Sequence, residues 1–152
     1  MIYLDNAATT WPKPESVYQA ADRCLRQYGA NPGRGGHRMS LQAGRIILET
    51  RELLANLFNI ADSSRIVFTG NVTEALNLGI KGLLKPGDHL VITSMEHNAV
   101  ARPAFRLQGL GVEHTVVPCS PEGRLAVLDL EKSLRPQTRL ICLNHASNVI
   151  GT

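Results

Sequence analysis

Three short polar segments stand out because each follows an apolar run of the kind that forms a buried strand. They are residues 69–74, 94–98 and 144–148, and all three are rich in small hydrogen-bonding side chains. In open parallel α/β sheets, ligands bind in the crevice beyond the carboxyl ends of the strands. We therefore expect the chemistry of this chain to lie in these segments.

The first segment has the parts of a phosphate-binding site. Gly70 permits close approach of the backbone, and Thr73 adds a hydroxyl donor to the outward-pointing N–H groups of a following helix. The segment matches neither the GxGxxG fingerprint nor a P-loop, because no Gly-Lys-Ser/Thr follows. In a second interpretation, Asn71 and Glu74 form a capping box that starts a buried helix. The spacing allows both.

The other two segments contribute a histidine and an asparagine. His97 could stack on a flat ligand or move protons, because an imidazole exchanges protons near neutral pH. Asn148 could donate to a ligand oxygen. A histidine after a strand is also commonly a surface or capping residue, and Asn148 could be an ordinary turn residue. The functional interpretation gains support because all three segments fall at one edge of one predicted sheet.

The histidines and cysteines lack the spacing of metal ligands, so no metal site is predicted. The cysteines are far apart, without a CxxC pair, and we expect them to be reduced and structural. The residues considered are His89, His97, His114, His145, Cys24, Cys119 and Cys142.

Alternating strands and helices must position these candidates. A helix is predicted from Pro14 to Gly29 and, after a glycine-rich turn, a second one from Ser40 as its N-cap. Strands are predicted at 65–69, 89–93, 111–117 and 139–143, and helices at 73–84, 98–107 and 128–134. This alternation predicts an α/β fold with a mostly parallel sheet and right-handed crossovers.

Composition excludes several classes of protein. The chain has 152 residues, 43% of them hydrophobic, which suits one compact domain. Its 16 Lys and Arg residues are scattered without a run of three, so nucleic-acid binding is not expected despite the net charge of +3. No apolar stretch approaches the roughly 20 residues of a membrane span, and no secretory signal opens the chain. We expect a cytoplasmic protein with no membrane partner.

Four motifs, taken in order, resemble the class V aminotransferase family, and within it the cysteine desulfurase and selenocysteine lyase group. The resemblance runs from the first residues to the last. The motifs are Tyr3-Leu4-Asp5-Asn6-Ala7-Ala8-Thr9-Thr10, Phe68-Thr69-Gly70-Asn71-Val72-Thr73-Glu74-Ala75, Glu96-His97-Asn98-Ala99 and His145-Ala146-Ser147-Asn148-Val149-Ile150-Gly151-Thr152. Four motifs in order are far more specific than any one of them.

The resemblance implies a fold-type I enzyme that uses pyridoxal 5′-phosphate (PLP). Thr73, with the backbone at Asn71 and Val72, would bind the cofactor phosphate. His97 would stack on the pyridine ring and assist proton transfer. Asn148 would hydrogen-bond near the ring hydroxyl and the substrate carboxylate.

The resemblance also implies substrate contacts and a domain arrangement. Asn6 and Ala7 would line the substrate pocket, and Arg34 would reach a substrate or phosphate anion across a homodimer. Without the family, the loop of Arg34 is simply a flexible basic turn. Residues 1–38 would be an extended segment, a helix and a glycine-rich loop, and residues 39–152 would be part of the PLP-binding large domain.

PLP requires a lysine that forms a Schiff base with it, and none of the four lysines stands in the expected setting. Lys13, Lys81, Lys85 and Lys132 do not stand in the family's Ser-x-His-Lys setting, in which a lysine holds PLP as a Schiff base. In the family that lysine, the Asp and Gln that hold the ring, and the persulfide-forming cysteine all come after the position of Thr152. We therefore expect the N-terminal portion of the enzyme, inactive by itself.

The favoured function is that of a cysteine desulfurase, which converts L-cysteine to L-alanine and an enzyme persulfide and passes the sulfur to an acceptor protein. One alternative keeps the family but changes the reaction to that of a transaminase, an epimerase or a selenocysteine lyase. Another is a non-enzymatic α/β domain that binds anions.

Overall fold

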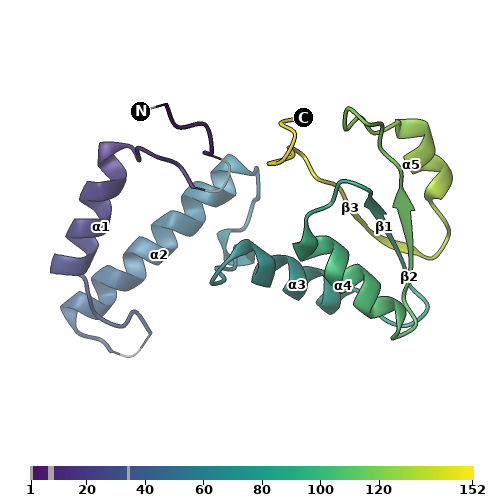
Figure 1. Ribbon diagram of the computed structural model, residues 1–152. Coiled ribbons are helices and arrows are strands. Elements are labelled where there is room, and N and C mark those ends of the chain that lie inside the picture. The colour runs from purple at the N-terminus through teal and green to yellow at the C-terminus, as the bar shows by residue number, and fades with distance from the viewer. Residues whose placement is uncertain (1, 7–8, 34) are drawn as a thin grey trace. The chain divides into compact units, whose positions relative to one another are not determined.

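The computed structural model describes residues 2–6, 9–33 and 35–152, which form two compact units, residues 1–67 and 68–152 (Figure 1). Each unit is described by itself. The division of the chain into residues 1–38 and 39–152 stays a prediction.

The first unit is helical. It contains α1 (Glu15–Gln27), α2 (Arg38–Leu57) and a short 3₁₀ helix, η1 (Ser63–Arg65). The prediction that Ser40 caps the second helix is wrong, because α2 begins three residues earlier than that cap implies, with His37 as its N-cap. The Nδ1 atom of His37 accepts from the Ser40 N–H at 3.4 Å, and the buried Ser40 hydroxyl instead donates to the Asn31 carbonyl at 2.9 Å.

The predicted strand at 65–69 is also wrong. Its first residue belongs to η1, which Asp62 starts by accepting from the Ser64 N–H at 2.9 Å. Among the described residues, 66–69 do not join the sheet. A strand needs a neighbouring backbone to pair with, and the three strands of the sheet pair with one another. An apolar β-branched run therefore does not by itself predict membership of this sheet.

The second unit is α/β. Its elements are α3 (Val72–Leu83), β1 (His89–Thr93), α4 (Asn98–Gln108), β2 (Glu113–Val117), α5 (Val127–Ser133) and β3 (Thr138–Cys142). The strands are parallel in the order β2-β1-β3, which confirms the predicted α/β class with a parallel sheet and flanking helices. The six predicted elements after residue 70 are confirmed, with boundaries that shift by one or two residues.

The central strand explains where the core lies. All five residues of β1 are buried, as expected for a strand with neighbours on both edges and packing against its face. The helices α3 and α4 lie side by side against the sheet (Figure 1). The core that they close consists of Ile80, Leu84, Leu90, Ile92, Val100, Ala104, Leu107 and Val112.

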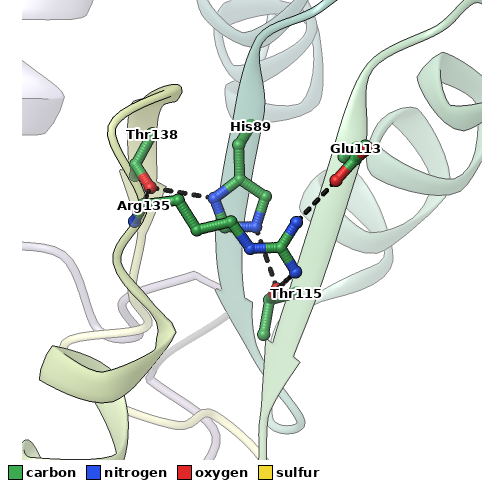
Figure 2. Close-up of polar contacts among 5 residues, drawn as sticks. All are labelled: His89, Glu113, Thr115, Arg135 and Thr138. Carbon is green, nitrogen blue, oxygen red and sulfur yellow. Dashed lines mark hydrogen bonds and ion pairs between the residues drawn. The ribbon is translucent and has the colours of Figure 1, made fainter.

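At the amino-terminal edge of the sheet, the buried His89 joins the starts of all three strands (Figure 2). Its Nδ1 atom lies 2.9 Å from the Thr138 hydroxyl, and its Nε2 atom lies 2.9 Å from the Thr115 hydroxyl. Arg135 donates to the carboxylate of Glu113 and, at 3.4 Å, to Thr115. Burial, and then the neighbouring Arg135 guanidinium, lower the pKa of His89. This network fixes the strand starts, at the edge opposite to the candidate site.

Across the described ranges, no helix combines the length and the apolar composition that a membrane crossing requires.

Candidate functional site

The start of α3 is a capping box. The Oδ1 atom of Asn71 accepts from the Glu74 N–H at 2.9 Å, and the Oε2 atom of Glu74 accepts from the Gly70 N–H at 2.8 Å. A Cβ atom on Gly70 would lie 3.1 Å from that carboxylate oxygen, so a glycine gives the carboxylate room to reach the backbone. The capping interpretation is thus correct for these two side chains.

The capping box does not use all the donors at the start of α3, so this turn could still bind a phosphate. In the part of the chain that the structure describes, the N–H groups of Val72 and Thr73 and the Thr73 hydroxyl have no hydrogen-bond partner. They stand in the exposed first turn of α3, where the helix dipole favours an anion. The cap therefore orders the turn while three donors stay available for a ligand.

His97 is the N-cap of α4. Its Nδ1 atom accepts from the Ala99 N–H at 3.1 Å. An accepting Nδ1 atom needs its lone pair, so the neutral ring carries its proton on Nε2. The ring is exposed and presents this N–H group to a ligand.

Thr73 and His97 line the same cavity, which has a volume of about 260 Å³ and lies between α3 and α4. Its lining includes the cations Lys81, Arg102 and Arg106, and none of the described residues that line it carries a carboxylate. The remaining lining residues are Asn77, Asn98, Ala99 and Pro103. The cavity thus combines a helix N-terminus, an imidazole and positive charge, which together favour an anionic ligand with a flat ring.

Glu96 connects two of the predicted segments. Its Oε1 atom accepts from the Thr93 hydroxyl at 2.7 Å and from the Asn144 N–H at 2.9 Å. The loop after β1 is thereby tied to the segment after β3. The sequence motifs assign no separate role to Glu96, although an acidic residue directly before His97 in a small polar segment is a usable signal.

Asn148 lies in an exposed turn beyond β3, in which the Ser147 hydroxyl accepts from the N–H groups of Val149 and Ile150. It shares the carboxyl edge of the sheet with His97, but it does not line the cavity of Thr73 and His97. Within the described ranges, its side chain has no hydrogen-bond partner. Of the three main candidates, the structure therefore brings together Thr73 and His97 in one cavity but not Asn148.

The predicted substrate-binding residues before residue 40 belong to the first unit or lie outside the described residues. The Oδ1 atom of Asn6 accepts from the Trp11 N–H at 3.0 Å. Ala7 and Arg34 lie outside the described residues.

None of the four lysines directly follows a strand in the described part of the chain. Lys13 precedes α1 and donates to Thr9 and Thr10, while Lys81 is on α3. Lys85 follows α3, and Lys132 is on α5, 3.8 Å from Asp129. These positions confirm the placements that the sequence predicts.

The cysteines are free thiols. Cys142, the last residue of β3, has a raised pKa, chiefly because it is buried and secondly because the Glu96 carboxylate lies nearby. A raised pKa keeps this thiol protonated and poorly nucleophilic. In the described part of the chain, no three His, Cys, Asp or Glu side chains are grouped so that they could hold a metal ion.

Known proteins resemble this chain over nearly its whole length. A model of the family described as aminotransferase class-V matches residues 2–152. A probable cysteine desulfurase of Methanothermobacter thermautotrophicus is 38% identical over 99% of this chain and 38% of its own. The apo structure of the cysteine desulfurase from Thermococcus onnurineus NA1 is 36% identical, with a TM-score of 0.88 over 98% of this chain and 38% of its own.

A third protein, SspA, was solved in complex with cysteine. It is 31% identical, with a TM-score of 0.84 over 97% of this chain and 43% of its own. The chain thus spans about two fifths of the length of the proteins that it resembles. On the family match over residues 2–152, the chain belongs to the class V aminotransferase family.

Proposed function

We propose that this chain provides the phosphate-binding and ring-stacking residues of a PLP-dependent cysteine desulfurase, which converts L-cysteine to L-alanine and a persulfide. The observation that carries the proposal is the cavity shared by Thr73 and His97, beside two N–H groups of α3 that have no hydrogen-bond partner among the described residues. The relatives named as cysteine desulfurases and the cysteine-bound SspA structure support this reaction over others of the family.

The described residues fit two parts of PLP. The donors at Val72 and Thr73 suit its phosphate, since hydrogen bonds to a charged acceptor at a helix N-terminus are strong. The exposed imidazole of His97 suits its flat ring. When bound, PLP supplies an electron sink for bonds broken at the substrate α-carbon. A lysine at a strand end, which would hold PLP covalently, is not among the four lysines of the chain.

The hydrogen bonds of His97 define what its ring can do. While its Nδ1 atom accepts from Ala99, the ring donates through its Nε2–H group. Uptake of a second proton requires a proton on Nδ1, and this breaks the cap of α4. His97 would therefore act mainly as a stacking and hydrogen-bonding group, and its use as a base would cost one hydrogen bond.

The other predicted site residues complete the proposal. Asn148 would bind near the ring hydroxyl and the substrate carboxylate. Asn6, Ala7 and Arg34 would contact the substrate, Arg34 from the partner subunit of a homodimer. A sulfur-acceptor protein would take the persulfide sulfur.

Binding of PLP to the 152-residue chain tests this proposal. We expect saturable binding of PLP in isothermal titration calorimetry, and at least about tenfold weaker binding of pyridoxal, which lacks the phosphate. Replacement of Thr73 by Val should weaken PLP binding about tenfold, because it removes a donor to a charged group. Thr50→Val is the matched control, since Thr50 is exposed and its hydroxyl donates to Ile46 within α2.

Equal binding of PLP and pyridoxal would contradict the assignment of α3 as the phosphate site. The reaction is tested on the product of the complete open reading frame that contains these residues. Alanine and persulfide formed from L-cysteine would support a desulfurase. Amino-group transfer to a 2-oxo acid, or selenium release with no sulfur release, would favour the other reactions of the family.

A further inference from the structure

Glu96 is half-buried between the carboxyl ends of β1 and β3, and its contacts suggest a role beyond that of a surface acid. One carboxylate oxygen, Oε1, accepts both the Thr93 hydroxyl at 2.7 Å and the Asn144 N–H at 2.9 Å. These donors are 51 residues apart in the sequence (144 − 93). A carboxylate that accepts two hydrogen bonds holds both donors more firmly than a neutral acceptor would.

The loop that contains Glu96 is itself well ordered by hydrogen bonds. The Thr93 hydroxyl accepts from the Met95 N–H at 3.3 Å, and the Ser94 hydroxyl accepts from the Cys119 N–H at 2.9 Å. The loop after β1 is therefore tied through Ser94 to the segment after β2 and through Glu96 to the segment after β3. His97 is the next residue and starts α4.

A second observation agrees with this position of the carboxylate. The pKa of Cys142 is raised first by burial and then by the charge of Glu96. The carboxylate therefore acts electrostatically on the last residue of β3, two positions before Asn144.

We propose that Glu96 is a positioning residue that holds the His97 loop and the segment leading to Asn148 in one arrangement for the cofactor ring. Glu96 does not line the cavity of Thr73 and His97. It therefore acts through the His97 loop and through the segment that leads to Asn148. This inference rests on the proposed function, because it assumes that His97 and Asn148 bind the same ligand.

A double-mutant cycle with PLP as the probe tests the coupling. In the unmodified chain, Asn148→Ala should weaken PLP binding about fivefold, whereas in the Glu96→Ala background it should weaken it less than about twofold. Glu96→Gln keeps an acceptor oxygen and should restore most of the coupling. Thr73→Val serves as the control, since its loss of affinity should be the same in every background.

A second measurement needs no ligand. Hydrogen exchange of the Asn144 amide should be at least about tenfold faster in Glu96→Ala than in the unmodified chain, with Glu96→Gln close to the latter. If circular dichroism shows that Glu96→Ala does not fold, Glu96→Asp replaces it, because its shorter side chain cannot reach both donors.

The possible results distinguish a failure of the proposed PLP site from a failure of the positioning role of Glu96. If Thr73→Val leaves PLP binding unchanged, the proposed function fails, and the exchange of the Asn144 amide still decides whether Glu96 bridges the loops. If Thr73→Val acts as expected but Asn148→Ala costs the same in every background, the positioning role of Glu96 is overturned. Unchanged exchange of the Asn144 amide in Glu96→Ala also overturns it.

Discussion

Two histidines of the second unit show how position decides what one residue type can do. His97 is exposed and accepts one hydrogen bond at Nδ1, so its Nε2–H group remains available to a ligand. His89 is 1% exposed, and both of its nitrogens contact threonine hydroxyls (Figure 2). We therefore propose a ligand-binding role for His97 and assign a structural role to His89.

The environment of His89 predicts a loss of stability in mild acid. Burial and Arg135 lower its pKa from the ordinary value of 6.5, while Glu113 partly opposes and His114 adds to the lowering. Below pH 6.5 the unfolded chain thus binds more protons than the folded chain. The contribution of His89 to stability is complete above that pH and is lost as the pH falls, with a slope of at most about 1.4 kcal/mol per pH unit.

Urea unfolding at about pH 5 and about pH 7.5 measures this dependence. His89→Gln should reduce the difference in unfolding free energy between the two pH values, whatever its effect at either one. His145→Gln, at an exposed position after β3, should leave the difference unchanged. A pH dependence that persists in full in His89→Gln would contradict the assignment.

At the scale of elements, the loops after the three strands determine whether the carboxyl edge can form a site. Gly123, after β2, has a φ of 78°, in the left-handed region. A Cβ atom there would contact Ile150, Thr152 and Met95. The loops after β1, β2 and β3 thus meet at one residue that has no side chain. Close packing at this edge depends on that glycine.

Substitution of two glycines by alanine should have opposite effects. Gly123→Ala should destabilise the chain by more than about 1 kcal/mol, because it adds both backbone strain and steric overlap. Gly79→Ala, in the interior of α3 with open space around its Cβ position, should stabilise it by about 0.5–1 kcal/mol. Both free energies come from urea unfolding, and equal effects of the two substitutions would refute the loop packing described above.

At the scale of the whole molecule, the second unit brings together the parts of a ligand site but not a covalent anchor. Its parallel order β2-β1-β3 places three strand ends at one edge, where α3 and α4 begin beside each other. Within this unit, Lys81 is on α3, Lys85 follows α3 and Lys132 is on α5, so none of these three lysines directly follows a strand. We therefore expect these 152 residues to bind PLP without turning over a substrate.

We expect that the purified 152-residue chain, supplied with PLP and L-cysteine, forms no more alanine than PLP alone. The reason is that none of the four lysines stands in the Ser-x-His-Lys setting in which the family holds PLP, and none of the three in the second unit follows a strand. Amino-acid analysis of the reaction mixture measures the product. Alanine above the cofactor-only level that disappears in Lys81→Met would show that the lysine in the cavity of Thr73 and His97 takes this role after all.

Much of the second unit was predictable because its local signals agree. The apolar strand at 89–93, the turn at Pro86 and Gly87 and the amphipathic helices all point to one α/β alternation, which the structure has. The errors lie where a local pattern needs a distant or unusual partner. Residues 66–69 have strand-like composition, but the described sheet is formed by β1, β2 and β3. His37 caps α2, although histidine is not a preferred cap.

The sequence by itself determined the α/β class, the order of its motifs and the residue types that could bind phosphate and a flat ring. Only the tertiary structure decided that Thr73 and His97 line one cavity, that Glu96 joins the segments after β1 and β3, and that His89 belongs to the opposite edge. The physical reason is that these contacts join residues about 25 to 50 positions apart. They depend on strand order and on the register between parallel strands, which local composition and periodicity do not specify.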